Sequence, residues 1–212
     1  MKMEDRKVKT LDLWNSICNH DDSNAFEVFF HLFNSRLIKF CVLYIHQKEA
    51  AEEIVSDVFV KCWINRKSMK EVQNPESYLY VAVKNQSLNY LRKYSNIHLV
   101  QIEDTQELKF INTYCPQKQM EKRELMFKLD QAVDSLPKQC QIVFKLIKED
   151  GMKYKEVATI LQISPRTVQT QLFRAIKKLS IVLEPYLDTR RPTFKGDILI
   201  QLIVFNIFFM SL

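Results

Sequence analysis

Hydrophobic residues recur at intervals of three and four along residues 24–45, the period that places side chains on one face of an α-helix. So dense an apolar face predicts a helix buried at the centre of a core. Asp22 or Ser23 precedes the run and suits the N-cap, because its side-chain oxygen can accept a hydrogen bond from a free backbone amide. The recurring positions are Phe26, Phe29, Phe30, Phe33, Leu37, Phe40 and Leu43.

A second apolar stripe follows in residues 47–66, where pairs of hydrophobic residues repeat every four positions. This pattern predicts one helix with a broad buried face. Residues 74–93 predict a third helix. Asn74 suits its N-cap, and Pro75 suits its first position, because the N–H that proline lacks would have no partner there.

Residues 94–121 carry no helical periodicity and have a net negative charge. Such a stretch is long for a loop inside one compact domain, so the sequence predicts a linker between two domains. Periodicity resumes in residues 125–136, breaks at Pro137 and continues in residues 142–147. Gly151 is placed to end this last helix.

Residues 154–173 predict two short helices joined by a tight turn, the geometry of a helix-turn-helix. Ser164 suits the N-cap of the second helix, with Pro165 at its first position. Gln162 stands in the turn, where glycine is common because the backbone there often needs a positive φ.

On a helical wheel this second helix has an apolar and a polar face. The second helix of such a pair fits the DNA major groove, where Arg donates to guanine, Gln pairs with adenine, and Thr bonds a base or touches a thymine methyl. Lys155, Lys177 and Lys178 suit phosphates, which position the protein without reading sequence. An ordinary amphipathic pair with a solvated polar face has the same local pattern. The polar face is Arg166, Thr170, Phe173 and Lys177, flanked by Thr167, Gln169 and Arg174.

The charge distribution favours DNA binding. The chain has a net charge of +6, and residues 122–182 hold twelve Lys and Arg against six Asp and Glu. Residues 1–93 hold fourteen against twelve. An excess of positive charge in one segment is typical of a surface that faces a polyanion, although a solvated basic face shows it too.

Composition narrows the other possibilities. Two glycines and six prolines in 212 residues favour long helices over a strand-rich fold. The five cysteines have no paired spacing, which argues against disulfides and a zinc site and predicts buried thiols in a reducing cytosol. The four histidines are scattered and no GxxxxGK[ST] motif occurs, so we expect no catalytic site, metal or cofactor. The first ten residues do not predict a secretory signal.

Two segments resemble a known family. Residues 129–179 closely resemble region 4 of bacterial RNA polymerase sigma factors of the extracytoplasmic-function (ECF) group. Residues 50–63 (AAEEIVSDVFVKCW) resemble the polymerase-binding helix of region 2 in that family, and residues 74–93 resemble its helix pair for the −10 promoter element. The matching pieces of region 4 are Leu136-Pro137, YKEVA at 154–158, SPRTV at 164–168 and RAIKKL at 174–179.

The resemblance implies an all-α fold of two small helical domains with an apolar C-terminal helix. Its expected parts are region 2 at residues 20–93, a linker at residues 94–121, region 4 at residues 122–182 and an apolar tail at residues 183–212. It also implies a cytoplasmic, non-enzymatic specificity subunit. Its expected partners are the β′ and β subunits of core RNA polymerase, promoter DNA and an anti-sigma factor.

The resemblance further implies three sets of site residues. This chain has Glu53 and Ser56 where the family more often has aspartate and glutamine. The core polymerase set is Glu53, Ile54, Ser56, Asp57, Phe59 and Trp63, of which Phe59 and Trp63 favour packing. The −10 set is Tyr78, Tyr80, Lys84, Asn85, Asn89, Arg92 and Lys93. The −35 set is Tyr154, Lys155, Ser164, Arg166, Thr167, Gln169, Thr170, Phe173, Arg174 and Lys177.

Residues 198–212 are almost wholly apolar and follow three basic residues. A helix of this length spans about 22 Å, short of the ~30 Å hydrocarbon core of a membrane. Three interpretations stay open: packing on its own domain, a helix for a partner or a membrane surface, and a marginal anchor at the inner face of the cytoplasmic membrane.

Three rival classes of protein remain. The output domain of a response regulator would need an upstream receiver, whose alternating strands and helices residues 1–93 do not predict. A nucleic-acid-modifying enzyme would need clustered metal or acid–base residues. A membrane-linked adaptor with degenerate DNA binding would depend on the tail.

Overall fold

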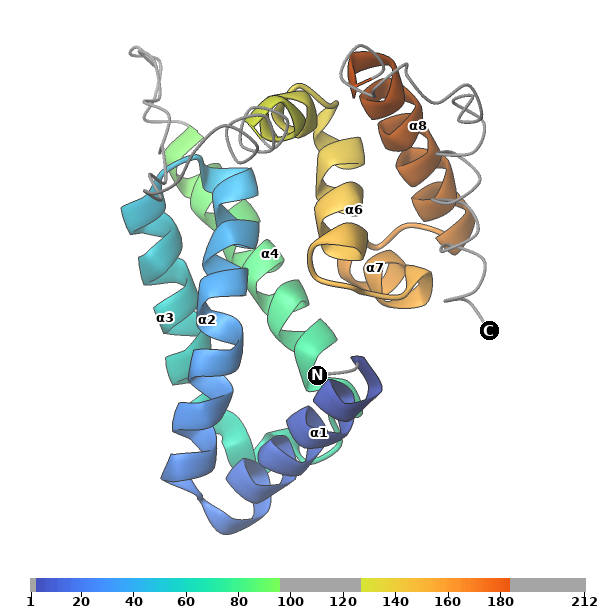
Figure 1. Cartoon of the computed structure of the whole chain (residues 1–212). Helices are drawn as coiled ribbons and strands as arrows, with labels where there is room; N and C mark the ends of the chain where they lie inside the picture. Colours follow the sequence, from blue (N-terminus) through green and yellow to red (C-terminus); the bar gives the residue numbers. More distant parts are fainter. Residues whose placement is uncertain (1–2, 96–126, 184–212) are drawn as a thin grey trace, which may run out of the picture. The chain divides into compact units, whose positions relative to one another are not determined.

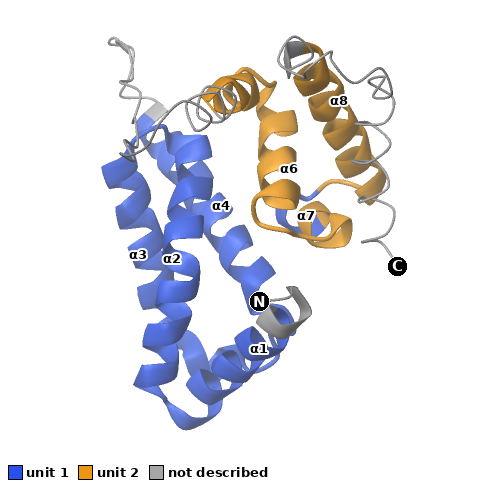
Figure 2. Cartoon of the chain, in the orientation of Figure 1, with its two compact units in different colours: residues 1–106, 159–162 blue, residues 107–158, 163–212 orange. Residues whose placement is uncertain are grey.

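The computed structural model describes residues 3–95 and 127–183, and α-helices and one short 3-10 helix are the regular structure of those two ranges (Figure 1). The chain divides into two compact units, residues 1–106 with 159–162 and residues 107–158 with 163–212 (Figure 2). The all-α prediction is therefore confirmed for the described residues.

Within residues 3–95, the first unit is a bundle of four α-helices and one 3-10 helix. In chain order its elements are α1 (Met3–His20), α2 (Ser23–Ile45), α3 (Lys48–Asn65), the 3-10 helix η1 (Arg66–Met69) and α4 (Pro75–Ser95). Helix α2 packs against α1, α3 and α4. Phe29, Phe33 and Leu37 are fully buried on it, which confirms the central buried helix that its phenylalanines predict.

Helix α2 is the one described helix that is long and apolar enough to cross a membrane by length and composition. Its buried residues form the core of the first unit together with Trp14 of α1, Val55 of α3 and Tyr80 of α4. The apolar face of α2 is thus buried by packing within the bundle.

Side-chain caps fix where two helices of this unit begin. The Asp22 carboxylate accepts a hydrogen bond from the Ala25 amide at 3.0 Å, and the Asn74 side chain accepts one from the Ser77 amide at 3.0 Å. Both oxygens satisfy amides that have no partner within the helix. The predicted caps at Asp22 and Asn74 are confirmed.

The second unit contains a helical stretch at residues 127–134, followed by α6 (Lys138–Lys148), α7 (Tyr154–Leu161) up to Ala158, and α8 (Pro165–Leu183). Helix α6 packs against α8. One cluster of its core joins the residues before Pro137 to the far half of α8. The members are Ala132, Val133, Leu136, Cys140, Ala175 and Leu179, with Leu129 and Phe144 packed against them.

The turn between α7 and α8 is closed by backbone hydrogen bonds. The Ile163 amide donates to the Ala158 carbonyl at 3.1 Å, and the Gln162 amide donates to the Thr159 carbonyl. This pair of bonds is a Schellman motif, which requires a residue in the left-handed conformation directly after the end of the helix. Gln162 occupies that position with φ 57°, so the chain uses glutamine where glycine is usual.

Part of the sequence prediction concerns segments outside the described ranges. The expected linker lies there from residue 96 onward, and so do the apolar tail from residue 184 and its expected C-terminal helix.

Candidate nucleic-acid interface

Helix α8 separates a buried face from an exposed, mainly polar face. Val168, Leu172 and Ala175 are at most 2% exposed. The opposite face carries four cationic side chains, an amide, a hydroxyl and one aromatic ring. These exposed residues are Arg166, Gln169, Thr170, Phe173, Arg174, Lys177 and Lys178.

The first turn of α8 is held by its own side chains. The Ser164 hydroxyl accepts a hydrogen bond from the Thr167 amide at 3.0 Å, which confirms Ser164 as the predicted N-cap. Thr167 is half-buried, and its hydroxyl lies 2.8 Å from that of Ser164. Both side chains are therefore engaged within the turn.

Two residues that were predicted to contact DNA, Tyr154 and Lys178, are partly engaged within the protein. Tyr154 is half-buried, and burial raises the pKa of its phenol. The Lys178 ammonium group donates to the Ser135 carbonyl at 2.8 Å, so this lysine holds two segments of the unit together as well as standing at the surface. Lys155 is exposed at the start of α7.

Some residues of α4 that were expected to contact the −10 element are buried. Tyr80 is 0% exposed, and its ring packs on Phe40 with centroids 4.9 Å apart, so it is a core residue and not a DNA contact. Lys84 is also buried, and burial lowers the pKa of its ammonium group. Tyr78 is half-buried with its ring 6.2 Å from that of Trp14.

The exposed part of α4 is its C-terminal half, where Asn85, Asn89, Arg92 and Lys93 lie at the surface. Two further tyrosines accompany them, which the sequence reasoning missed. The Tyr90 and Tyr94 rings are 4.5 Å apart, and the Lys93 ammonium group is 5.4 Å from the Tyr94 centroid. The signal for this group was the i, i+4 spacing of two tyrosines beside basic residues.

The residues of α3 that were predicted to contact polymerase differ in their burial. Glu53, Ser56 and Asp57 are exposed, whereas Ile54 and Phe59 are only 7% and 2% exposed. Ile54 is thereby corrected to a core residue. Phe59 is a packing residue, as the sequence favoured, with its ring against those of Phe26 and Phe30.

Two apolar residues continue the exposed face of α3. Val60 and Ile64 are 55% and 67% exposed and lie one turn apart. They were missed because a stripe of apolar pairs predicts a buried face and does not distinguish residues at its edge. The exposed face of α3 is hence partly acidic and partly apolar.

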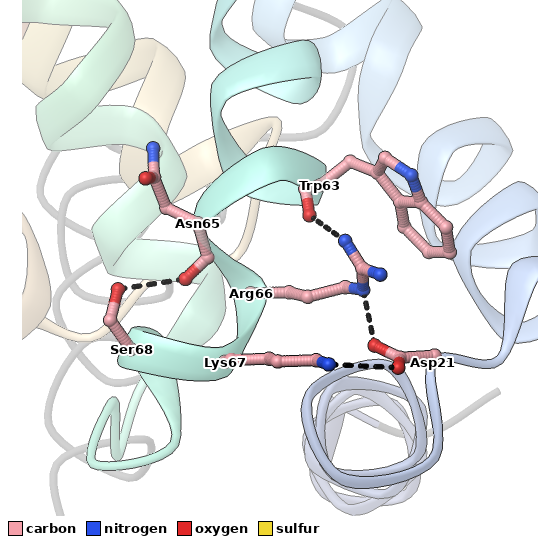
Figure 3. A network of polar contacts seen from close by, with 6 residues as sticks. All are labelled: Asp21, Trp63, Asn65, Arg66, Lys67 and Ser68. Atoms are coloured by element: carbon pink, nitrogen blue, oxygen red, sulfur yellow. Dashed lines mark hydrogen bonds and ion pairs between the residues drawn. The ribbon is translucent and has the colours of Figure 1, made fainter.

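Trp63 and the turn after α3 form a network with the α1–α2 corner (Figure 3). The Trp63 ring is half-buried with the Phe26 ring 4.9 Å away, and the Arg66 guanidinium lies 4.2 Å above it. Arg66 donates to the Trp63 carbonyl and to the Asp21 carboxylate, each at 2.6 Å. Trp63 is therefore a packing residue that helps to fix η1, as the sequence favoured.

Asp21 sits at the centre of this network with φ 55°. Its carboxylate also pairs with the Lys67 ammonium group at 3.4 Å. The hydrogen bond from Arg66 lowers the pKa of the Asp21 carboxyl. Trp14 adds a further tie, because its indole N–H donates to the Met69 carbonyl at 3.2 Å.

No group of His, Cys, Asp or Glu that could hold a metal ion occurs in the ranges 3–95 and 127–183. Four of the five cysteines fall in those ranges, and all four are free and buried. Burial raises the pKa of the Cys62 thiol to about 12.

Comparison with known proteins identifies both units. Residues 29–97 match the family model "Sigma-70 region 2", and residues 126–179 match "Sigma-70, region 4". The matched ranges contain α4 and most of α2 in one case, and the helix-turn-helix in the other. The two domains are thus those of bacterial transcription initiation factors.

The curated relatives that match this chain over most of their length are RNA polymerase sigma factors. The RNA polymerase sigma-H factor of Pseudomonas aeruginosa is 22% identical over 175 residues, covering 78% of this chain and 90% of its own. SigV of Bacillus subtilis is 27% identical, covering 66% and 80%. The ECF sigma-E factor of Escherichia coli K12 is 22% identical, covering 77% and 89%. The chain belongs to the sigma-70 family of RNA polymerase sigma factors, in its ECF group.

Two solved structures share the fold, each with a TM-score of 0.54. One is CnrH in complex with the cytosolic domain of CnrY, 16% identical and covering 84% of this chain and 97% of that one. The other is the sigma factor RpoE in complex with the anti-sigma factor NepR from Bartonella quintana, 20% identical and covering 75% and 96%.

Proposed function

We propose that the protein binds core RNA polymerase through the exposed face of α3 and directs initiation at promoters with separate −10 and −35 elements. Family membership makes it a sigma factor. The exposed polar and cationic face of α8, within a helix-turn-helix, is the main support for the proposed recognition of promoter DNA. Such a face can enter the major groove of duplex DNA.

On α8 the proposal separates base reading from positioning. Arg166 and Gln169 lie in the first turns, where side chains of a recognition helix reach base edges. Arg174 and Lys177 lie further along and contact phosphates. Ser164 and Thr167 set the start of the helix through their mutual hydrogen bonds and contact DNA only at its backbone.

On α4 the proposed −10 contacts are the exposed residues of its C-terminal half. Asn85 and Asn89 offer amides to bases, and Arg92 and Lys93 offer charge to phosphates. Tyr90 and Tyr94 provide the aromatic surface on which unpaired bases stack, a role that Tyr80 cannot fill from the core.

On α3 the proposed polymerase contact consists of Glu53, Ser56, Asp57, Val60 and Ile64. Apolar side chains within a polar rim are typical of protein interfaces. The exposed Glu52 beside them pairs with Lys48 at 3.5 Å.

The proposed action involves no catalytic chemistry of the protein's own. Promoter selection and opening follow from binding energy, and the proposed location is the cytoplasm. The complex of RpoE with the anti-sigma factor NepR supports a further proposal, that an anti-sigma partner holds this protein inactive.

The test is reconstitution. Purified protein is added to core RNA polymerase from a bacterium that carries it, and transcripts are sequenced from a promoter library. The proposal predicts start sites downstream of two conserved elements that core polymerase alone does not select. Start sites identical to those of core polymerase alone would reject it.

A further inference from the structure

The connection between α3 and α4 joins the helix that is proposed to bind polymerase to the helix that is proposed to bind the −10 element. It consists of η1 and the residues up to Asn74, because α3 ends at Asn65 and α4 begins at Pro75. The conformation of this connection sets the direction in which α4 leaves α3. The contacts that hold it in place therefore also set how the two proposed surfaces are oriented toward each other.

The connection is tied to the end of α1 by ion pairs. Asp21, which directly follows α1, pairs with the Arg66 guanidinium at 2.6 Å and with the Lys67 ammonium group at 3.4 Å (Figure 3). Arg66 also donates to the Trp63 carbonyl, so one guanidinium joins the α1–α2 corner to the last turn of α3. The rigid fork of N–H groups on arginine suits such a double contact.

A second tie runs from the middle of α1. The Trp14 indole N–H donates to the Met69 carbonyl at the end of η1, at 3.2 Å. Trp14 is 1% exposed, and its ring lies 5.4 Å from that of Phe29 on α2 and 6.2 Å from that of Tyr78 on α4. Breaking a buried hydrogen bond leaves its donor without a partner, so this contact resists displacement. Trp14 thus fixes the end of η1 between two helices.

Neither tie belongs to the surfaces proposed above. Asp21 and Trp14 lie outside the exposed faces of α3 and α4, and α1 precedes residue 29, where the match to Sigma-70 region 2 begins. The simplest alternative role is stability, because α1 also buries Ile17 and Cys18 in the core. The two roles predict different results. A loss of stability weakens every function of the unit together, whereas a loss of position separates them.

We propose that Asp21 and Trp14 are positioning residues, which act through η1 to hold α4 in the orientation that engages the −10 element while α3 is bound to polymerase. This inference rests on the proposed function and adds the residues that link its two surfaces. Because neither side chain contacts polymerase or DNA, removing a tie should impair promoter opening and leave polymerase binding unchanged.

The experiment compares polymerase binding with promoter opening, below the melting temperature of every variant. Fluorescence titration of the full chain gives the affinity for core polymerase, and a fluorescent base analogue in the −10 element reports opening by the holoenzyme. Asp21→Asn removes the carboxylate and keeps a residue that accepts the positive φ of this position. Its affinity for polymerase should stay within about twofold of the wild type, and opening should fall about threefold to thirtyfold, the range for residues that couple two sites.

The sign of the effect separates positioning from direct contact with DNA. Asp21→Asn removes a negative charge and leaves Arg66 and Lys67 in place, so electrostatic attraction to phosphates alone predicts tighter DNA binding and more opening. Glu27→Gln is the matched control, because it removes a carboxylate whose side chain is 71% exposed elsewhere in the same unit. This control should not reduce opening.

Trp14→Phe gives a second test without a change in charge. It keeps an aromatic ring and removes the N–H that binds the Met69 carbonyl. Opening should again fall while the affinity for polymerase stays, and a melting curve checks that the variant is folded. If Trp14→Phe does not fold, Asp21→Asn decides the question, because the Asp21 side chain is 45% exposed and its loss leaves the core intact.

Two results with Asp21→Asn would overturn the inference. One is opening equal to or above that of the wild type, and the other is a loss of polymerase affinity as large as the loss of opening, which would assign the ties to stability alone. Unchanged opening by a folded Trp14→Phe variant would remove Trp14 from the proposal. A wild-type holoenzyme that opens no promoter is a different outcome, which counts against the proposed function itself.

Discussion

At the scale of single residues, Gln162 shows how a local sequence rule can be broken without loss of the motif. The Schellman turn that ends α7 demands a left-handed residue, and Gln162 adopts φ 57° there. A side chain in this region costs about 1–3 kcal/mol, which the surrounding turn has to offset.

We expect Gln162→Gly to leave stability unchanged or raise it slightly, because glycine removes the strain but adds freedom to the unfolded chain. Gln162→Val should destabilise the second unit by about 1–3 kcal/mol, since a β-branched residue tolerates positive φ poorly. Urea denaturation of the full chain measures both, with Gln162→Asn as the control that accepts this conformation. Equal stability of the Val and Gly variants would contradict the explanation.

Asp21 links the α1–α2 corner to η1 through ion pairs with Arg66 and Lys67. Its carboxyl pKa is held below the ordinary value of 3.8 by the hydrogen bond from Arg66. A carboxyl group with a lowered folded pKa adds stability that is complete above the unfolded pKa and is lost as pH falls through the folded one.

Asp21→Asn should therefore lower the melting temperature at neutral pH and flatten the loss of stability below pH 3.8. Thermal unfolding followed across acidic pH measures this slope. Asp57→Asn is the control, because it removes an exposed carboxylate outside the network. An unchanged acid slope in Asp21→Asn would show that the ion pair is too solvated to matter.

At the scale of elements, α2 and α4 are joined by an ion pair between Arg36 and Glu76 at 3.0 Å. The Glu76 side chain is 7% exposed and that of Arg36 is 21% exposed, so the pair is largely removed from water. Losing one member leaves a desolvated charge behind, which costs more than the pair itself contributes.

We expect Glu76→Gln to destabilise the first unit by about 3 kcal/mol, the lower end for a buried pair because Arg36 keeps some exposure. The double variant Arg36→Met with Glu76→Met should recover most of this loss. A double-mutant cycle by chemical denaturation gives the coupling. Strict additivity of the two single changes would contradict a direct interaction.

The edge of α3 offers a test of the proposed polymerase contact. Ile64→Glu should weaken core polymerase binding about tenfold or more without destabilising the bundle, because Ile64 is 67% exposed and a charge there would be desolvated at an apolar contact. Val28→Glu on α2, where the side chain is 46% exposed, is the matched control. Fluorescence titration with core polymerase measures both, and equal weakening would place the contact elsewhere.

Elements with strong periodicity were predictable from sequence, and those with weak periodicity were not. The phenylalanine series of α2 and the caps at Asp22, Asn74 and Ser164 appear as expected. Helix α1 was missed. Its buried side chains, Trp14, Ile17 and Cys18, are few and sit among charged residues, so the pattern was diluted.

The sequence also did not show which residues at the edge of a helix face are buried. A wheel shows which face of a helix is apolar, but not which neighbour covers it. Tyr80 and Ile54 were assigned to contact sets and lie in the core, whereas Val60 and Ile64 were assigned to no contact set and lie at the surface. Only tertiary packing separates these cases.

At the scale of the whole molecule, one domain is proposed to bind core polymerase and the −10 element, and the other to bind the −35 element. Central to this division is the proposal that the polar face of α8 reads duplex bases. Arg166 at the start of that face and Lys177 near its far end are both exposed cations, so they form a natural comparison.

The most direct measurement is the base preference of holoenzymes containing wild type, Arg166→Ala and Lys177→Ala, read from a library randomised in the −35 element. Arg166→Ala should change the preference at one or two positions by about 1–3 kcal/mol, whereas Lys177→Ala should weaken binding to all sequences alike. If Arg166→Ala also weakens every sequence equally, α8 does not read bases through this residue and the central claim fails.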